Sequence, residues 1–134
     1  AGHMLIKRHP DDDFPGSCPY HGDCLEGMAS GTSMQERWGK PGVEIEEEEA
    51  WELEAFYLAQ AAMNALLTYS PEKIIFGGGV MEHPGLIDQI RSQFTALLNG
   101  YIKKDQVLQQ VEDYLVLPGL GSDAGLKGSL ALVL

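Results

Sequence analysis

Residues 73–100 read KIIFGGGVMEHPGLIDQIRSQFTALLNG, and the order of elements in this stretch decides the fold class. The apolar run at 73–76 is typical of a buried parallel strand and leads directly into three glycines. Pro84-Gly85 then introduces a helix with apolar side chains at helical spacing, and Asn99-Gly100 supplies its stop. A strand, a glycine turn and a helix in this order predict an α/β layer structure.

The flanking segments extend the same pattern. Residues 47–69 contain no Gly or Pro and carry apolar side chains at helical spacing, which predicts a long helix with one buried face. Residues 114–117 predict a second strand, 118–121 a turn and 123–133 a final helix capped by Ser122. These elements predict a largely parallel sheet in the C-terminal half of the chain.

The number of predicted strands is small for an α/β sheet. Residues 27–43 are ambiguous, although 29–38 are compatible with a short helix. Because strands are missing, we expect the sheet to leave an apolar edge exposed. That edge is expected to be covered by another part of the same protein, by a second copy in a homodimer, or by an exchanged segment.

Composition limits the classes of partner. The 134 residues are 44% hydrophobic, which is enough for one packed domain. With 9 basic and 20 acidic side chains the formal net charge is -11, which opposes binding to nucleic acid or to an anionic membrane.

The acidic runs and the cysteines have ordinary interpretations. The glutamates at 46–49 are expected to open the long helix, and the aspartates at 11–13 to be solvated turn residues. Without a bilayer-length apolar stretch or a signal peptide, and with two cysteines, a cytoplasmic protein is expected.

A set of metal-ligand residue types lies near the start of the chain. Cys18, His21 and Cys24 are spaced three apart, with turn-forming Pro and Gly between them. Either His3 or His9 can supply a fourth ligand, which gives a closed Cys2His2 set suited to structural zinc and leaves no position for an activated water. Iron or cobalt can occupy such a set, and a disulfide or two free thiols are the alternatives without a metal.

The glycine turn at 77–79 is a second candidate site. Glycines at the carboxyl end of a parallel strand let a backbone approach a nucleotide closely. The stretch matches neither GxxxxGK[ST] nor GxGxxG, so a tight turn without a ligand is an equally good interpretation from these residues alone.

Five stretches occur in collinear order: GH at 2–3, CPYHGDCLEGMASG at 18–31, ERWG at 36–39, IIFGGGVMEHPGL at 74–86 and LPGLGSDAGLKGSLAL at 117–132. Together they resemble the C-terminal part of the ROK sugar kinases, in particular the bacterial fructokinase branch. The resemblance implies an α/β C-terminal lobe of an actin-like (ribonuclease H-like) ATPase fold, here without its first strands. Residues 1–134 are then one lobe fragment, with a zinc-binding loop at 3–24 and an adenosine-binding turn at 77–81.

The resemblance also implies roles for individual residues. It favours His3 over His9 as the ligand that completes the Zn2+ site with Cys18, His21 and Cys24. Glu26, and His3 as well, are implied as contacts of the hexose.

The nucleotide contacts that the resemblance implies are Gly77, Gly78, Gly79, Val80 and Met81, with ATP bound as its Mg2+ complex. The family's catalytic aspartate lies upstream of the GH pair, so no catalytic residue is expected in this chain, and we expect none of the aspartates at 11–13 to replace it.

The implied function is phosphorylation of D-fructose to fructose 6-phosphate by a parent enzyme, and the fragment alone is expected to be inactive. The alternatives are a kinase for glucose or mannose, and the zinc-stabilised sugar-sensing lobe of a ROK-type transcriptional repressor. In either kinase the expected partners are a hexose, ATP, the N-terminal part of the enzyme and a second copy of the chain.

Overall fold

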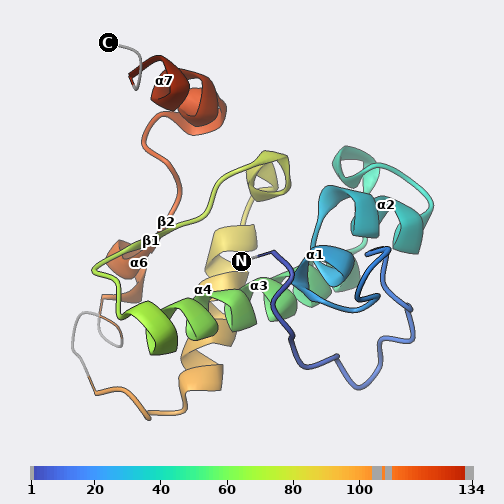
Figure 1. The fold of residues 1–134 in the computed structure, drawn as a ribbon, viewed down its shortest axis with the longest axis horizontal. Coiled ribbons are helices and arrows are strands. Elements are labelled where there is room, and N and C mark those ends of the chain that lie inside the picture. Colours follow the sequence, from blue (N-terminus) through green and yellow to red (C-terminus); the bar gives the residue numbers. More distant parts are fainter. Residues whose placement is uncertain (1, 104–106, 108–109, 132–134) are drawn as a thin grey trace.

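The computed structural model describes residues 2–103, 107 and 110–131 (Figure 1). Its helices are α1 (Leu25–Met28), α2 (Gly31–Trp38), α3 (Glu48–Tyr69), α4 (Leu86–Leu98), α6 (Val111–Tyr114) and α7 (Ala124–Ala131). Its strands are β1 (Ile74–Ile75) and β2 (Leu115–Val116), and single 3-10 turns lie at Gly42–Glu44, Gly79–Glu82 and Gly121–Asp123. The described part is therefore mixed and mostly helical, with a small parallel sheet.

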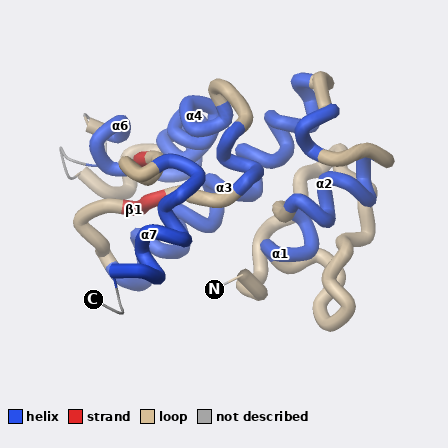
Figure 2. Tube along the Cα trace, turned by 90° about the horizontal axis from the view of Figure 1, so that it is seen from above, coloured by secondary structure: helices blue, strands red, loops and turns tan. Residues whose placement is uncertain are grey.

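The long helix α3 runs between two ends of the structure. The loop that begins the chain lies with α1 and α2 at one end, and the sheet lies with α6 and α7 at the other (Figures 1 and 2). The sequence predicted this helix at 47–69, and it ends where Ser70 adopts a left-handed conformation with φ of 46°. Helix formation is favoured by the Gly-free and Pro-free run and by Glu48 and Glu49 in the first turn.

The core is built where α3 packs against α4. Small side chains of α3, including Ala55, Ala59 and Ala62, are buried and let the α4 backbone approach closely. The facing side of α4 contributes Ile90 and Phe94, which are fully buried. The predicted stop of α4 is confirmed, because Asn99 follows Leu98 with φ of 45°.

The two strands pair in parallel, with Ile74 opposite Leu115 and Ile75 opposite Val116. The predicted parallel pairing is confirmed, but the prediction of a buried strand at 73–76 is wrong in one respect. Ile75 is 63% exposed, because side chains alternate along a strand and only the face that carries Ile74 packs on the core. Tyr114, expected in the second strand, is instead the last residue of α6.

The remaining predicted elements differ at their bounds. The helix expected within 29–38 is α2, whose start is fixed by a capping box between Ser30 and Ser33. The final helix, expected over 123–133, is observed over Ala124–Ala131, and residues 132–134 lie outside the described part. The side chain of Ser122, the expected cap, also lies outside it. None of the described helices has the length and apolar content needed to cross a membrane.

One buried carboxylate departs from the apolar core of α3. Glu54 is fully buried, and among the described residues neither of its carboxylate oxygens has a hydrogen-bond partner. Burial raises the pKa of Glu54 to about 8, against the opposing positive charge of Arg37. The folded chain therefore keeps this side chain protonated at neutral pH.

The stability of the fold should consequently fall as pH rises from about 4.5 to about 8, because over that range the folded state holds a proton that the unfolded state has lost. We expect Glu54→Gln to remove this dependence and to raise the unfolding temperature at about pH 8 by roughly 3 °C or more. Thermal unfolding at several pH values, with the exposed Glu52→Gln as the control, measures the effect. Parallel pH profiles for Glu54→Gln and the unmodified chain would contradict it.

Candidate functional site

The four side chains with metal-ligand chemistry lie together. The potential ligand atoms of His3, Cys18, His21 and Cys24 are all within 4.8 Å of one another. His3 Nδ1 is 3.6 Å from each cysteine Sγ, and His21 Nδ1 is 3.8 Å from Cys18 Sγ. Bonds of about 2.3 Å to sulfur and about 2.0 Å to nitrogen in a tetrahedral zinc site separate the ligand atoms by roughly 3.6 Å. The spacing therefore fits one zinc ion at the centre of the four atoms.

His9, the other candidate for the fourth ligand, lies outside this cluster. Its ring packs edge-on against Phe56 with 4.9 Å between the centroids, and its Nδ1 accepts a hydrogen bond from the Asp11 amide. Sequence spacing alone left both histidines open as the fourth ligand. Their positions in the structure favour His3 over His9.

A tight hairpin brings three of the potential ligands together. Cys18 and Gly22 exchange backbone hydrogen bonds of 3.3 and 2.9 Å, and Gly22 has a φ of 64° that favours glycine. A Cβ on Gly27 would lie 1.9 Å from the Gly22 carbonyl oxygen, so the first turn of α1 packs directly on the hairpin backbone. This contact places Cys24, at the start of α1, beside Cys18.

Both cysteines are buried and neither forms a disulfide. The backbone amide of Tyr20 is the main cause that lowers the pKa of Cys18 to about 7, with further amide and side-chain hydrogen bonds acting in the same direction and burial opposing them. A thiolate at neutral pH is the form that binds a soft divalent metal, whereas magnesium and calcium prefer oxygen ligands.

Glu26 lies on α1 next to the cluster. Its backbone amide donates to the Gly2 carbonyl at 2.7 Å, and the amide of Leu25 donates to the Met4 carbonyl at 3.0 Å. The Glu26 carboxylate is packed over Gly2, where an added Cβ would be 2.7 Å from Oε2. The segment that carries His3 is therefore joined to the start of α1, and both expected hexose contacts are exposed near each other.

The glycine turn lies at the carboxyl ends of both strands. Gly78 has a φ of 108°, and the turn continues into the 3-10 segment Gly79–Glu82. A cavity of about 420 Å³ on one side is lined by Gly77, Gly78, Met81, Glu82, Leu117, Pro118 and Gly121. Open parallel sheets commonly bind ligands at this position, just beyond the carboxyl ends of the strands.

A second cavity, of about 580 Å³, lies against the same turn. Gly79 and Val80 line it together with Gly31 of α2. Its aromatic wall is His83 stacked on Trp51, with 3.6 Å between ring centroids and planes 8° apart, and burial lowers the pKa of His83. The five expected nucleotide residues thus line two neighbouring cavities. Met81 is among them, although most of its side chain is buried in the core.

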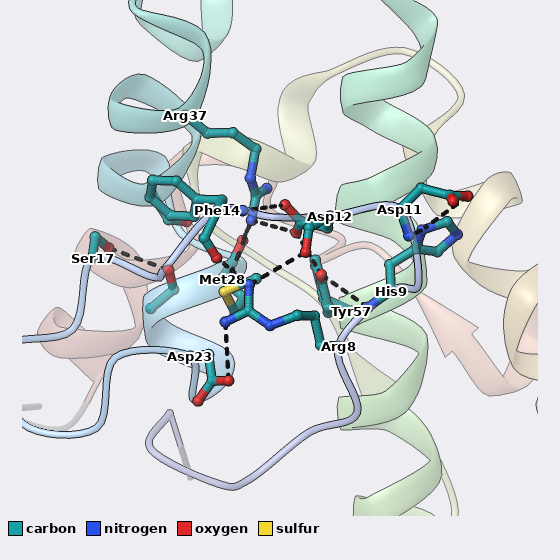
Figure 3. A network of polar contacts seen from close by, with 12 residues as sticks. Arg8, His9, Asp11, Asp12, Phe14, Ser17, Asp23, Met28, Arg37 and Tyr57 are labelled. Atoms are coloured by element: carbon teal, nitrogen blue, oxygen red, sulfur yellow. Dashed lines mark hydrogen bonds and ion pairs between the residues drawn. The ribbon is translucent and has the colours of Figure 1, made fainter.

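The expectation of solvated aspartates at 11–13 is wrong for Asp12, which is only 7% exposed. Its Oδ2 accepts the Tyr57 hydroxyl at 2.5 Å and pairs with Arg37 Nη2 at 3.1 Å (Figure 3). Burial, followed by this hydrogen bond, raises the pKa of Tyr57 to about 12, so its hydroxyl remains a donor. Turn chemistry alone did not reveal these partners, which come from α2 and α3.

The family follows from comparison with known proteins. The ROK family model matches residues 1–134, and the chain belongs to this family. The chain is similar to the fructokinase of Zymomonas mobilis subsp. mobilis (47% identity, covering 99% of this chain and 44% of the relative). It is also similar to the fructokinases of Lactococcus lactis subsp. cremoris (49%, covering 87% and 40%) and Streptococcus mutans serotype c (42%, covering 98% and 45%). The chain thus spans less than half the length of these relatives.

The metal hypothesis predicts about one zinc per chain after purification without chelators. His3→Ala should lose most of this zinc and His9→Ala should keep it, because of these two histidines only His3 lies in the cluster. Elemental analysis together with titration of the thiols measures both quantities. Much less than one zinc per chain, with both thiols freely reactive, would contradict the hypothesis.

The close contact at Gly27 gives a separate test of the hairpin geometry. Gly27→Ala should displace the Gly22 carbonyl and lower the unfolding temperature and the zinc content, since backbone atoms must move to admit the methyl group. Gly128→Ala in α7 is the matched control, because a Cβ there meets no atom within 4 Å. Equal thermal stability and zinc content in both variants would show that the packing of α1 on the hairpin is wrong.

Proposed function

We infer that the chain is the C-terminal lobe of an ATP-dependent sugar kinase that converts D-fructose to fructose 6-phosphate. The observation that carries this proposal is the closed Cys2His2 cluster with Glu26 beside it, in a ROK chain that is 42–49% identical to fructokinases. The lobe belongs to an actin-like fold, as family membership implies. Thiolate ligands agree with the reducing cytoplasm expected from the sequence.

In this proposal the zinc has a structural role. His3, Cys18, His21 and Cys24 hold it, and four protein ligands leave no coordination position for substrate or water. When bound, zinc would supply positive charge to balance the two thiolates, and its ligands Cys18, His21 and Cys24 would hold the hairpin against the start of α1. The effect of the metal site on sugar binding would be indirect, because the ordered metal site holds Gly2, His3 and Glu26 in one arrangement.

Glu26 and His3 are proposed to bind hexose hydroxyls. A carboxylate accepts hydrogen bonds from hydroxyl groups. The exposed Glu26 is positioned by the backbone bonds of Glu26 to Gly2 and of Leu25 to Met4, and it forms no ion pair with any residue that the structure describes. Specificity for fructose over mannose or glucose is proposed from the fructokinase relatives.

The nucleotide is proposed to bind at the turn formed by residues 77–81. Support comes from the position of this turn at the carboxyl ends of β1 and β2, and from the two cavities that adjoin it. ATP would bind as its Mg2+ complex, which positions and neutralises the phosphates for transfer.

The catalytic base is proposed to lie in an upstream part of a longer polypeptide. Within this chain Asp12 is engaged by Arg37 and Tyr57 and is unsuited to accept a proton from a sugar. The described part of the chain has a sheet of only two strands, with Ile75 of β1 exposed. Further strands from the same source are proposed to pair with an edge of this sheet, and the enzyme is proposed to form a homodimer.

Kinetics of the longer polypeptide and of the isolated chain test the proposal. The longer polypeptide should phosphorylate fructose with ATP in preference to glucose and mannose, and the isolated chain should show no measurable turnover. Glu26→Gln should raise the KM for fructose about 10-fold or more and leave the KM for ATP unchanged, since it weakens hydrogen bonds to the sugar alone. Glu36→Gln, an exposed carboxylate on α2, is the control.

Two results would contradict this account. Turnover by the isolated chain near that of the longer polypeptide would show that the catalytic base is present here. Equal fructose KM values for Glu26→Gln and Glu36→Gln would remove Glu26 from the sugar site.

A further inference from the structure

The loop between His3 and Cys18 takes part in a buried polar cluster outside the metal site. The cluster joins Asp12 of this loop to Arg37 of α2 and Tyr57 of α3. At its centre, Asp12 uses both carboxylate oxygens (Figure 3). Oδ1 accepts the Phe14 amide at 3.1 Å, and Oδ2 accepts the Tyr57 hydroxyl and the Arg37 guanidinium. Tyr57 also accepts the His9 amide at 3.2 Å, so one hydroxyl of α3 contacts two points of the loop.

Arg37 connects this cluster to the helix that follows Cys24. Its side chain is 8% exposed, and its guanidinium lies over the Phe14 ring at 4.7 Å from the centroid. Nη2 donates to the Met28 carbonyl at 3.2 Å, and Met28 is the last residue of α1. The residue that neutralises Asp12 therefore also fixes the end of the short helix that carries Glu26.

A second path leads from the cluster to the hairpin. Arg8 donates to the backbone carbonyls of Asp12 and Phe14, and its Nη2 pairs with Asp23 Oδ2 at 3.1 Å. Asp23 directly precedes Cys24. The contacts of Asp12 thus reach both sides of Cys24, through Arg8 to the residue before it and through Arg37 to α1 after it.

The loop is also held along its length by α3. Gln60 accepts the Lys7 amide at 2.7 Å and donates to the Lys7 carbonyl at 2.9 Å, as a neighbouring strand would do. Bringing His3 to Cys18 around a loop of this length costs conformational entropy unless the loop is ordered beforehand. The contacts of Asp12, Tyr57 and Gln60 provide that order without any metal.

We propose that Asp12, Arg37 and Tyr57 form an anchor that positions the metal ligands before zinc binds, so that the affinity for zinc depends on a buried ion pair outside the coordination shell. The proposal rests on the zinc site of the proposed function. Asp12 and Arg37 act as positioning residues, because they contact the ligand-bearing segments and not the ligand atoms.

The zinc dissociation constant, measured by competition with a chelator of known affinity, tests the anchor. Asp12→Asn and Arg37→Gln should each weaken zinc binding about 10-fold or more, as loss of outer contacts does in other metal sites. The double variant should be little weaker than either single variant, because the two residues act as a pair. Tyr57→Phe, which keeps the ring and loses one hydroxyl, should weaken binding roughly 3-fold, and the exposed Asp13→Asn should leave it unchanged.

Thermal unfolding of the metal-free and zinc-loaded forms separates positioning from general stability. An anchor that serves only the fold would lower both unfolding temperatures equally and leave the dissociation constant within twofold of the unmodified value in all variants. That result would overturn the anchor and leave the zinc site intact. Failure of the unmodified chain to bind zinc would overturn both proposals.

Discussion

Two buried thiols and two imidazoles within 4.8 Å of one another impose the main constraint on this structure. As thiolates, the two sulfur atoms repel each other, and burial makes that repulsion larger because the surroundings screen it poorly. A divalent cation bound between the four atoms would convert the repulsion into attraction. The tight hairpin and its packing on Gly27 have their clearest physical reason in this requirement, because they bring the sulfur atoms to distances that suit a common metal.

Helix α3 joins this constraint to the rest of the chain. Its alanines pack against α4, which lies against the small sheet and the glycine turn. Its polar side chains Tyr57 and Gln60 hold the loop that carries the first ligand. Helix α3 therefore supports the loop that carries His3 through the middle of its length, and it borders the expected nucleotide region through Trp51 in its first turn. The buried Glu54 lies between these regions and is kept neutral by its surroundings.

The sequence predicts local features well and buried polar partners poorly. Helices α3 and α4 were predicted within a residue or so, because periodic apolar runs and strong stop signals define them. The convergence of Cys18, His21 and Cys24 was predicted from ligand residue types only three apart with turn-forming residues between them. Asp12 was misassigned to solvent because its partners, Arg37 and Tyr57, come from distant helices that no local pattern identifies. Ile75 was expected to be buried because apolar content does not show which strand face the chain covers.

The coordination of zinc in the zinc-loaded chain tests the central claim most directly. X-ray absorption at the zinc edge, measured on the purified chain, reports the number and type of ligand atoms. The structure predicts two sulfur ligands at about 2.3 Å and two imidazole nitrogens at about 2.0 Å, with no bound water. A shell with fewer than two sulfur atoms, or one completed by water oxygen in place of the second imidazole, would contradict the closed cluster of His3, Cys18, His21 and Cys24.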